Sequence, residues 1–370
     1  MIFCTACGTL PASPSGPPER PSLLLVTLDT TRADHLGAYG ATAAKTPVLD
    51  ALARRGARWA QALTASPLTL PAHCSLLTGL QPPEHGVRDN GVAALPAEVP
   101  TLATALAEHG YVTAAVVASR VLDRRFGLDR GFATYDDRMV AESVGQYGYP
   151  ERDARAVTDA ALAWLAGREG DPGAAERPWF LWVHYYDPHA PYRPPAAASL
   201  ATEAERYAGE ISWVDEQLER LLAALPAAGA ATLVAVVGDH GESLGEHGET
   251  GHGIFLHQPS LRVPLLIAGP GVAPGTVVSE TVATSRLAAT LLGLLGSGAA
   301  AAPFGPPLPG IGLDASQAGD AAVYSETLLP ATAYGWSALK AITDGEWRLV
   351  VAPRPQLYDL GADPGELVNL

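Results

Sequence analysis

The chain has 370 residues, 48% of them hydrophobic and 17% charged, and this composition suits one large globular domain with a second, smaller one. Its formal net charge of −15 argues against nucleic acid or an anionic membrane as a partner, because both require a basic protein surface. A small anionic substrate would need local positive charge from a metal ion, a helix N-terminus or a few Arg and His side chains.

Residues 1–20 are expected to be a signal remnant or a flexible tether. MIFCTACGTLPASPSGPPERP places a cysteine after small residues and before a Pro/Ser/Gly-rich stretch, like the end of a bacterial lipoprotein signal without its charged start. Either the start site is assigned too late or the similarity is accidental. Export as a periplasmic or outer-surface lipoprotein is favoured, with a cytoplasmic location as the alternative. Three cysteines, Cys4, Cys7 and Cys74, are too few for a disulfide framework.

Short apolar runs alternate with amphipathic stretches over most of the chain. The runs that we expect to be strands are 23–28, 111–117, 178–184, 232–238 and 263–269. They are continuous rather than alternating, which indicates burial on both faces. The expected fold class is therefore α/β, a large sandwich with a central, mostly parallel sheet covered by helices on both faces.

Helical spacing marks the stretches between these runs. The expected helices are 46–56, 99–110, 153–167 and 205–225, several with Gly at the end. Residues 287–302 are the most apolar, but Gly and Ser interrupt them. We therefore expect a surface helix that runs into a linker, and no transmembrane segment.

The last 75 or so residues are expected to divide into a linker and a small subdomain. GSGAAAAPFGPPLPGIG opens a Gly/Ala/Pro-rich linker at 296–320. AVYSET, WSALKAIT and EWRLVVA then predict a small antiparallel C-terminal α+β subdomain at 321–370. The catalytic α/β domain would thus span 21–295.

Two of the expected strands end in residues suited to metal binding. Asp29 follows the first strand, and Asp239 and His240 follow the fourth. In open α/β sheets, ligands bind beyond the carboxyl ends of the strands, and two carboxylates with an imidazole suit a divalent cation. Taken singly, each Asp is better explained as the cap of a following helix or turn. Together they favour a metal site.

LTLPAHCSLLTG at 68–79 predicts a helix start, with Thr69 at or beside the cap and Pro71 near the first helical position. A hydroxyl there faces free backbone N–H groups, which favour an incoming oxyanion. A Thr hydroxyl is almost fully protonated at neutral pH, so it needs a base or a metal to act as a nucleophile. From this motif alone, a simple N-cap is the better explanation.

Histidines gather in two other loops. HYYDPHAPYRPP at 184–195 holds His189, and it is either a set of polar groups over the site or a rigid turn made by its prolines. Four of the ten histidines lie between 240 and 257, and solvated loop residues would explain some of them. We assign a function to only two of these four, His240 and His252.

From about residue 21 to its end, the chain resembles the sulfatase family of the alkaline-phosphatase superfamily. The motifs that carry the resemblance follow one another in the family's order: LDTTRADHLGAYG, TPVLDALARRG, LTLPAHCSLLTGLQPPEHGVRDNG, DPHAPY, GDHGESLGEHG, LRVPLLIAGPG and QLYDLGADPGELVNL. The resemblance implies the alkaline-phosphatase/sulfatase-like fold and metal-dependent hydrolysis of sulfate or phosphate esters.

By motif position, the resemblance also implies residue roles. One divalent ion, which could be calcium, zinc, manganese or magnesium, would be held by Asp29, Thr69, Asp239 and His240. Thr69 would also be the nucleophile, and His73, in place of the usual arginine, is the second catalytic candidate. His189 and His252 would bind the sulfuryl or phosphoryl oxygens, with His252 at the position of a common lysine.

The chain departs from the family where sulfatases form their formylglycine. The usual Cys/Ser-x-P-x-R motif is replaced by Thr69, Leu70, Pro71, Ala72 and His73, and Thr cannot become formylglycine. Cys74 lacks the required Pro and Arg spacing, so it is interpreted as a buried helix residue. Thr30 stands where the family has a second aspartate, and no G-K-W-H signature occurs near 118–121.

These departures leave two alternatives to a Thr-dependent hydrolase. DHGESLGE is similar to the phosphoethanolamine transferases, so a phosphoryl-group transferase is one alternative. A non-catalytic anion-binding protein with the same fold is the other. The expected partner is an anionic small-molecule, glycan or lipid ester. The sequence leaves the choice of sulfate or phosphate and the oligomeric state open.

Overall fold

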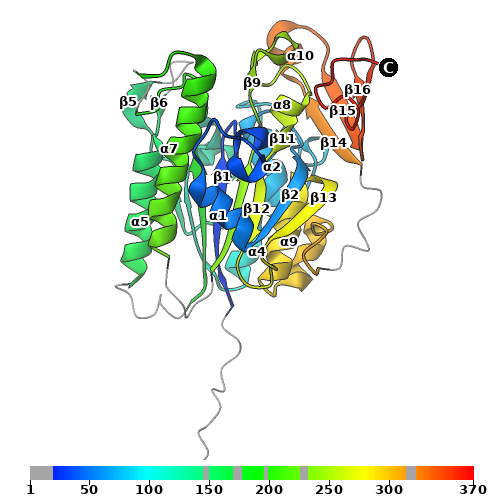
Figure 1. Ribbon diagram of the computed structural model, residues 1–370. Helices are drawn as coiled ribbons and strands as arrows, with labels where there is room; N and C mark the ends of the chain where they lie inside the picture. The colour runs from blue at the N-terminus through cyan, green and yellow to red at the C-terminus, as the bar shows by residue number, and fades with distance from the viewer. Residues whose placement is uncertain (1–19, 145–149, 170–176, 196–198, 226–231, 314–321) are drawn as a thin grey trace, which may run out of the picture.

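The computed structural model of the protein describes residues 20–144, 150–169, 177–195, 199–225, 232–313 and 322–370 (Figure 1). The lipoprotein-like start with Cys4 and Cys7, and most of the second half of the expected linker, lie outside these ranges. Both interpretations, and the location of the protein, stay predictions. Within the described ranges, none of the helices is both long and apolar enough to cross a membrane.

A large sheet lies at the centre of the molecule, with its strands in the order β11, β2, β12, β8, β1, β7, β3, β4, and with β13 also paired to β2. Each of the five expected strands is found in it. The bounds are β1 Ser22–Leu28, β2 Ala57–Leu63, β3 Val112–Val116, β4 Thr134–Asp136, β7 Trp179–Tyr185, β8 Thr232–Gly238, β11 Arg262–Val263, β12 Leu265–Ala268 and β13 Thr276–Ala283.

Helices and short strands connect the members of this sheet. The α-helices are α1 Pro47–Arg55, α2 Thr69–Thr78, α3 Pro82–His85, α4 Leu102–Glu108, α5 Ala154–Glu169, α7 Glu203–Ala223, α8 Gln258–Leu261, α9 Leu287–Leu294 and α10 Leu329–Tyr334. Two strand pairs lie outside the main sheet, β5 Val140–Val144 with β6 Pro150–Glu151, and β9 Ser243–Leu244 with β10 Thr250–Gly251. The four expected helices correspond to α1, α4, α5 and α7.

The middle of the sheet is parallel, and one side of it is mixed. β1 pairs in parallel with β7 and β8, and β3 pairs in parallel with β7. β12 runs antiparallel to both β8 and β2. The sequence pattern did not predict β2 or β13, because polar side chains such as Arg58, Gln61 and Glu280 interrupt their apolar runs.

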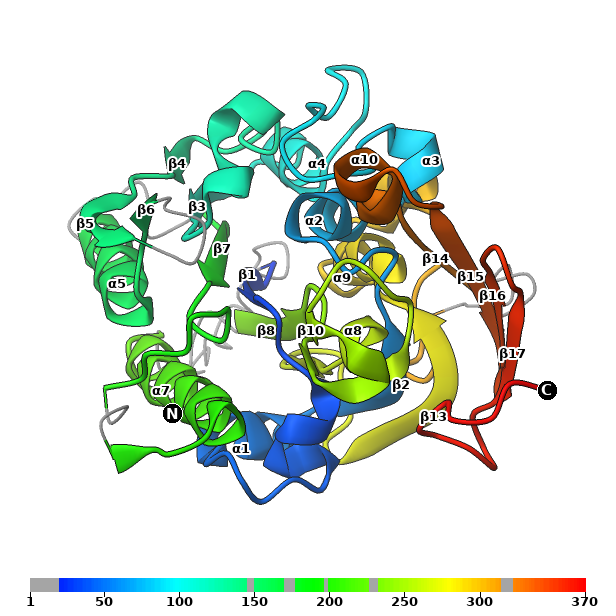
Figure 2. The same cartoon turned by 90° about the horizontal axis from the view of Figure 1, so that it is seen from above.

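The side chains of β1 show why helices cover both faces of the sheet. Leu23 and Leu25 point into one buried cluster, which they share with α2, α4 and α9. Leu24 and Val26 point into a second cluster with α1, α5 and α7. Successive side chains of a strand face opposite sides, so the continuous burial of β1 requires a layer on each face. The expected α/β class is confirmed (Figures 1 and 2).

α9 is a buried helix, which corrects the expected surface helix at 287–302. Leu291 and Leu292 are fully buried, and α9 packs against α2 and α4. A helix that is apolar on every side has no polar face to offer to water, so it is stable only inside the protein. The described part of the expected linker is also packed, because Phe304 and Leu308 belong to the same buried cluster.

The C-terminal subdomain is a four-stranded antiparallel sheet made of β14 Val323–Thr327, β15 Leu339–Asp344, β16 Trp347–Val351 and β17 Gln356–Asp359, in that order. Its inner face packs Val323, Ala341 and Val350 against Leu256 and Leu261 of the main domain. The expected antiparallel C-terminal sheet is confirmed, with β17 as an additional strand.

A buried ion pair joins this subdomain to the end of the chain. Arg348 and Glu366 are both 0% exposed in their side chains, and Arg348 Nη1 lies 2.7 Å from Glu366 Oε1. The backbone N–H of Gln258 in α8 donates to Glu366 Oε2 at 2.6 Å. Burial opposes the ionisation of Glu366, but contacts with His257 and Arg348 hold its pKa below the usual value. The pair thus fixes the C-terminal segment to the main domain.

Replacing Glu366 should therefore destabilise the protein. Glu366→Gln leaves the Arg348 guanidinium buried without its counter-charge, so the free energy of unfolding should fall by about 3 kcal/mol in denaturant titrations. Because the folded-state pKa of Glu366 is lowered, its contribution is present above the unfolded value of 4.5 and is lost as the pH falls. The free energies of unfolding of wild type and variant should therefore approach each other in acid. Asp344→Asn, at an exposed position of β15, is the control. A loss below about 1 kcal/mol would contradict a structural role of the pair.

Candidate active site

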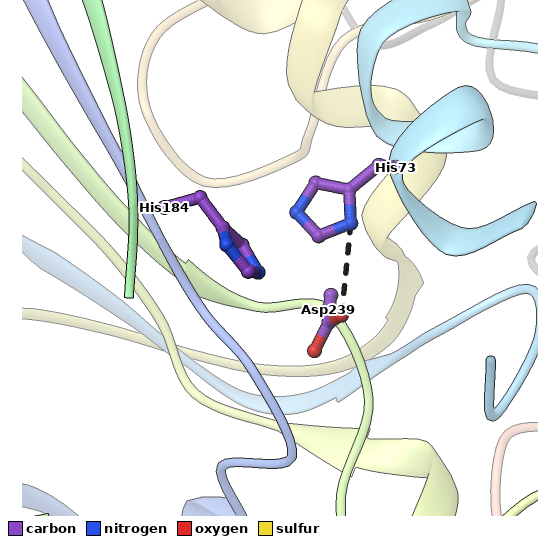
Figure 3. Close-up of side chains that lie close together, drawn as sticks. All are labelled: His73, His184 and Asp239. Carbon is purple, nitrogen blue, oxygen red and sulfur yellow. Dashed lines mark ion pairs between the residues drawn. The ribbon is translucent and has the colours of Figure 1, made fainter. Parts of the chain in front are cut away.

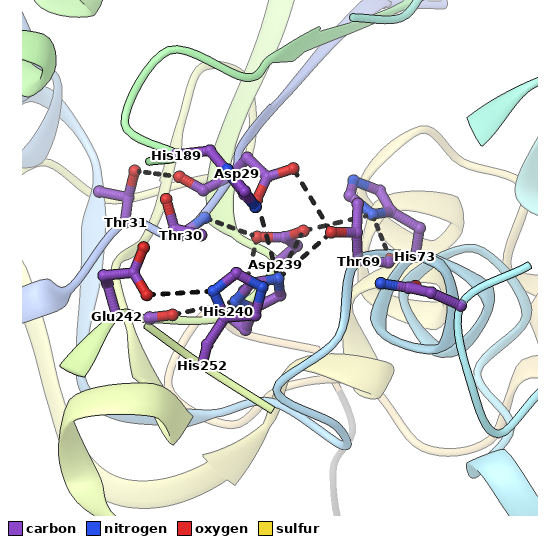
Figure 4. A network of polar contacts seen from close by, with 12 residues as sticks. Asp29, Thr30, Thr31, Thr69, His73, His189, Asp239, His240, Glu242 and His252 are labelled. Atoms are coloured by element: carbon purple, nitrogen blue, oxygen red, sulfur yellow. Dashed lines mark hydrogen bonds and ion pairs between the residues drawn. The ribbon is translucent and has the colours of Figure 1, made fainter. Parts of the chain in front are cut away.

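β1 and β8 bring the two expected carboxylates together. The strands are parallel neighbours, and their last residues Leu28 and Gly238 are paired, so Asp29 and Asp239 leave the sheet side by side. Asp29, Asp239 and His240 are all fully buried. Figure 4 shows the three side chains pointing toward one another from the ends of the two strands.

α2 begins at Thr69 and directs its hydroxyl toward this cluster. The N-cap position is held by Leu68, whose side chain makes no cap hydrogen bond, so the explanation of Thr69 as a simple N-cap is wrong. Thr69 Oγ1 instead lies 3.3 Å from His240 Nε2 and 3.5 Å from Asp29 Oδ2 (Figure 4). The structure therefore brings together all four residues expected to hold a metal.

The ring of His240 is held in one tautomer. Its Nδ1 lies 3.0 Å from the carbonyl oxygen of Gly241, which can only accept, so Nδ1 carries the proton. Burial holds the pKa of His240 well below the usual value, so the ring is neutral. Its Nε2 therefore presents a lone pair to Thr69 and to the two carboxylates. This arrangement is typical of a metal-binding histidine.

The two carboxylates fit a cation between them. Asp29 Oδ1 and Asp239 Oδ2 are buried and have no hydrogen-bond partner within the described residues. His240 Nε2 lies 3.7 Å from the first and 3.6 Å from the second. Burial raises the pKa of Asp29, and burial followed by the charge of Asp29 raises the pKa of Asp239 well above 3.8. A divalent cation would offset both the repulsion and the unmet hydrogen bonds.

A second group of potential ligand atoms, from His73, His184 and Asp239, lies behind this site (Figure 3). His73 Nδ1 lies 2.7 Å from the Thr69 carbonyl oxygen, and its Nε2 lies 3.0 Å from the Thr27 hydroxyl. Burial lowers the pKa of His73 to about 3, so the ring is neutral and both nitrogens are already engaged. We interpret this group as support for Thr69 and not as another metal site.

The structure places His73 behind Thr69 and not at the surface of the cleft. It is fully buried and is absent from the residues that line the cleft described below. A neutral ring also cannot supply the positive charge of the arginine that it replaces. Its catalytic role stays a prediction, and its contacts are those of a residue that positions Thr69.

His189 and His252 lie on the open side of the cluster, as expected for residues that bind substrate oxygens. Their rings meet edge to face with centroids 5.1 Å apart (Figure 4). His252 Nδ1 lies 3.0 Å from Glu242 Oε1. Burial alone would lower the pKa of His252, but the Glu242 carboxylate raises it above the usual value. Burial lowers the pKa of His189 to about 4. His252 is thus the more strongly positive of the two.

A cleft of about 590 Å³ opens over Thr69, His189 and His252. It is far larger than a sulfate or phosphate group needs, so it has room for the alcohol part of an ester. Its remaining walls come from both the main domain and the C-terminal subdomain: Leu68, Asp89, Asn90, Gly91, Ser119, Arg120, Val121, Arg125, Phe126, Glu151, Tyr186, Leu329 and Tyr334.

Three residues of the site could not be identified from the sequence. Asn90 Oδ1 accepts the N–H of Leu70 at 2.9 Å and so completes the start of α2. Glu242 is fully buried beside His252, and His184 Nε2 lies 3.2 Å from Asp29 Oδ2. Glu242 and His184 lie within motifs already singled out, and Asn90 closes the GVRDN stretch. Only the fold shows which neighbours they meet.

The fold and this arrangement indicate an α/β protein with an enzyme-like site beyond the carboxyl ends of the central strands. The comparison with protein families makes the class specific. The family model "Sulfatase" matches residues 21–297, and the chain belongs to the sulfatase family.

Relatives agree with this assignment along almost the whole chain. Choline-sulfatase from Rhizobium meliloti is 28% identical, and the match covers 95% of this chain and 82% of the relative. Delta 4,5-hexuronate-2-O-sulfatase from Bacteroides thetaiotaomicron is 24% identical, with 95% and 85% covered. The chain is thus an ester hydrolase of the sulfatase type.

Solved structures share the fold. Ps i-CgsB in complex with k-i-k-neocarrahexaose superposes with a TM-score of 0.76 at 19% identity, covering 95% of this chain and 88% of that chain. The phosphonate monoester hydrolase of Agrobacterium radiobacter gives a TM-score of 0.71 at 22% identity, with 95% and 91% covered. The expected alkaline-phosphatase/sulfatase-like fold is confirmed.

Asp239→Asn should have opposite effects with and without metal. In chelator-treated protein, the variant removes one of two facing buried carboxylates, so its free energy of unfolding at pH 7 should exceed that of wild type by about 1 kcal/mol or more. Because the folded-state pKa of Asp239 is raised, ionisation of this carboxyl destabilises the wild type increasingly as the pH rises above 3.8. The extra stability of the variant should therefore disappear below that pH. Added Zn²⁺ or Mn²⁺ should stabilise wild type but not the variant.

The control for this experiment is Asp159→Asn, because the Asp159 side chain is 55% exposed and pairs with Arg220 instead of facing another carboxylate. Thermal melting with and without each metal gives the readout. Equal stabilisation of wild type and Asp239→Asn by metal would contradict the assignment of Asp239 as a ligand.

Proposed function

We propose that the protein hydrolyses sulfate or phosphate esters with Thr69 as the nucleophile, aided by one divalent cation held by Asp29, Thr69, Asp239 and His240. The observation that carries this proposal is the position of the Thr69 hydroxyl at the floor of the cleft. It faces the neutral His240 Nε2 at 3.3 Å and the Asp29 carboxylate at 3.5 Å. An unsupported Thr hydroxyl would be a poor nucleophile, and here it lies among metal-ligand atoms.

The set of ligand atoms favours a transition metal over calcium. Calcium takes six to eight oxygen ligands, whereas imidazole nitrogen suits zinc, copper, iron or nickel, and carboxylates also suit manganese. Two carboxylates, one imidazole and one hydroxyl would suit zinc or manganese. When bound, such an ion lowers the pKa of the hydroxyl and offsets the charge of the two carboxylates.

Thr69 Oγ1 would attack the sulfur or phosphorus atom while the bond from that atom to the leaving alcohol breaks. The proton of the Thr69 hydroxyl leaves as the covalent Thr69 ester forms, and the alcohol oxygen takes up a proton as it departs. Thr69 carries a single hydroxyl on its Cβ, so no second hydroxyl is present to drive cleavage of the Cβ–Oγ1 bond of the covalent ester. Water must therefore attack the sulfur or phosphorus in the second step, which regenerates the hydroxyl.

The residues around Thr69 are arranged to stabilise negative charge on the transferred group. Thr69 is the first residue of α2, so the positive end of the helix dipole lies beside it. His252, with its raised pKa, supplies a positive ring above the site. Asn90 lines the cleft, and because its Oδ1 is taken by the Leu70 N–H, its Nδ2 remains as a donor. Together these groups form a site for equatorial oxygens.

Sulfated sugars are the substrate class that we favour. One relative is named a Delta 4,5-hexuronate-2-O-sulfatase, and the solved neighbour Ps i-CgsB is in complex with a neocarrahexaose. A cleft of about 590 Å³ has room for a sugar ring. Transfer to an acceptor alcohol instead of water would make the protein a transferase, and this alternative is separated from hydrolysis by the product formed.

Thr69→Ala should abolish turnover. With aryl sulfate, aryl phosphate and bis-aryl phosphate as substrates, kcat should fall on the order of a thousandfold or more, because the covalent intermediate can no longer form. Thr69→Ser keeps the hydroxyl and should retain activity to within about tenfold. Metal content should be measured by mass spectrometry in parallel.

Each outcome of this experiment decides a point. Metal-dependent turnover that Thr69→Ala loses and Thr69→Ser keeps would establish the nucleophile and rank the ester classes. Bound metal without turnover would indicate a transferase or an anion-binding protein. Neither metal nor turnover would overturn the proposed site.

Asn90→Asp tests the oxygen-binding role of Asn90. The substituted carboxylate can still accept the Leu70 N–H, so folding should be preserved, but it replaces a donor with a negative charge facing an anionic ester. We expect kcat/KM to fall about a hundredfold with little change in melting temperature. Asn90→Ala, which removes both interactions, should also lower the melting temperature. Unchanged kcat/KM in Asn90→Asp would exclude contact between Asn90 and the substrate.

A further inference from the structure

Two exposed aromatic rings stand at the mouth of the cleft. Tyr334 is 57% exposed and Trp336 is 63% exposed, although both are large apolar side chains. Their rings are stacked, with centroids 5.0 Å apart and planes inclined by 28°. Exposed apolar side chains that lie together, unlike ones scattered singly, are typical of interaction sites. The pair adds nothing to the buried core of the protein.

The position of the pair relates it to the reaction centre. Tyr334 lines the same cleft as Thr69, His189 and His252. Trp336 lines a smaller adjoining pocket of about 200 Å³, whose walls are mostly apolar. Because Tyr334 and Trp336 stack on each other, they connect the lining of the cleft with the lining of this second pocket.

A short turn holds the two rings face to face. α10 ends at Tyr334, and Gly335 follows with φ of +67°, a left-handed conformation that glycine adopts without strain. The N–H of Trp336 then donates to the carbonyl oxygen of Pro330 at 2.9 Å. The reversal at Gly335 is what lets side chains two residues apart stack on each other.

Two hydrogen bonds fix the stretch from Thr327 to Trp336, which forms one wall of the cleft, to the loops that carry His252 and Asn90. The Thr327 hydroxyl donates to the carbonyl oxygen of Gly253, next to His252, at 2.5 Å. The Thr332 hydroxyl donates to Asp89 Oδ2, next to Asn90, at 2.5 Å. The wall is therefore fixed relative to both sides of the reaction centre. A preorganised surface binds its ligand without the entropic cost of ordering a loop.

We propose that Tyr334 and Trp336 form a stacking subsite for a sugar or aryl ring in the alcohol part of the ester. This proposal rests on the proposed function and adds the residues that bind the alcohol part. The negative face of an aromatic ring attracts the positively polarised C–H groups of a sugar ring and the edge or offset face of an aryl ring. A quaternary ammonium group is the other common partner of aromatic surfaces, and choline sulfate in the following experiment distinguishes it from a ring.

Ligand binding to Thr69→Ala protein tests the subsite without interference from turnover. Isothermal titration would use glucose 6-sulfate, 4-nitrophenyl sulfate and choline sulfate, which carry a sugar ring, an aryl ring and no ring. Adding Tyr334→Ala or Trp336→Ala should weaken the binding of at least one ring-bearing ester about tenfold and leave choline sulfate unchanged. Loss with the sugar ester alone identifies a glycan subsite, and loss with the aryl ester alone identifies an aryl subsite.

Trp347→Ala is the matched control, because Trp347 is a tryptophan with 49% exposure on β16 of the C-terminal sheet, away from the cleft lining. All variants should keep the wild-type melting temperature, since the side chains removed are largely exposed. Unchanged binding of both ring-bearing esters, an equal loss with choline sulfate, or no binding of any ester would overturn the subsite.

Turnover by protein with an intact Thr69 separates this proposal from the proposed function. If Tyr334→Ala and Trp336→Ala weaken ring binding but no ester is hydrolysed, the hydrolase assignment of Thr69 fails and the subsite stands. If esters are hydrolysed with a kcat/KM that neither variant changes, the subsite fails and the hydrolase assignment stands.

Discussion

The repulsion between two buried carboxylates is the interaction on which the arrangement of the site depends. Asp29 and Asp239 emerge from paired ends of neighbouring parallel strands, with no water-exposed surface to screen them. In such surroundings two like charges repel strongly, and each would hold a proton unless a cation lies between them. Three features bring potential ligand atoms to the place where such a cation would lie. They are the parallel register of β1 and β8, the tautomer of His240 and the position of the Thr69 hydroxyl.

The replacement of an arginine by His73 changes where the positive charge of the site comes from. A hydrogen-bonded chain runs from Trp182 Nε1 to Thr27 Oγ1 at 3.0 Å, from Thr27 to His73, and from His73 to the Thr69 carbonyl oxygen. This chain supports the backbone of the nucleophile but contributes no charge, because the ring is neutral. Positive charge is instead supplied over the cleft by His252, which the buried carboxylate of Glu242 sustains.

The central strands and the main helices were predictable, because they depend on local pattern. Asp29, Asp239 and His240 were singled out by their positions after two strands, whereas Thr69 joined them only through the family resemblance. A continuous apolar run such as 23–28 can be satisfied only by a sheet buried on both faces, and Asp29 at its end then lies at the ligand edge. β2 was not predicted because Arg58 and Gln61 lie among its apolar residues. α9 was misplaced because the Gly, Ser and Ala residues that follow it suggested a linker, although a helix that is apolar on every side requires burial.

Tertiary contacts set the remaining features. Periodicity does not show that Asn90 reaches the N-terminus of α2, or that His73 turns inward to a carbonyl oxygen while Thr69 turns outward to the cluster. These side-chain directions depend mainly on distant residues: Leu70 for Asn90, Thr27 for His73, and Asp29 and His240 for Thr69. The sequence motif therefore located His73 beside the nucleophile without revealing that it lies behind it.

The stretch from Thr327 to Trp336 comes late in the chain, yet it forms one wall of the cleft and is bonded to the loops carrying His252 and Asn90. Synthesis proceeds from the N-terminus, so a ribosome-bound chain holds every metal-ligand candidate some ninety residues before this wall emerges. Until then the reaction centre is open to water on that side. The order of synthesis thus delays the assembly of a competent cleft until the C-terminal sheet has docked.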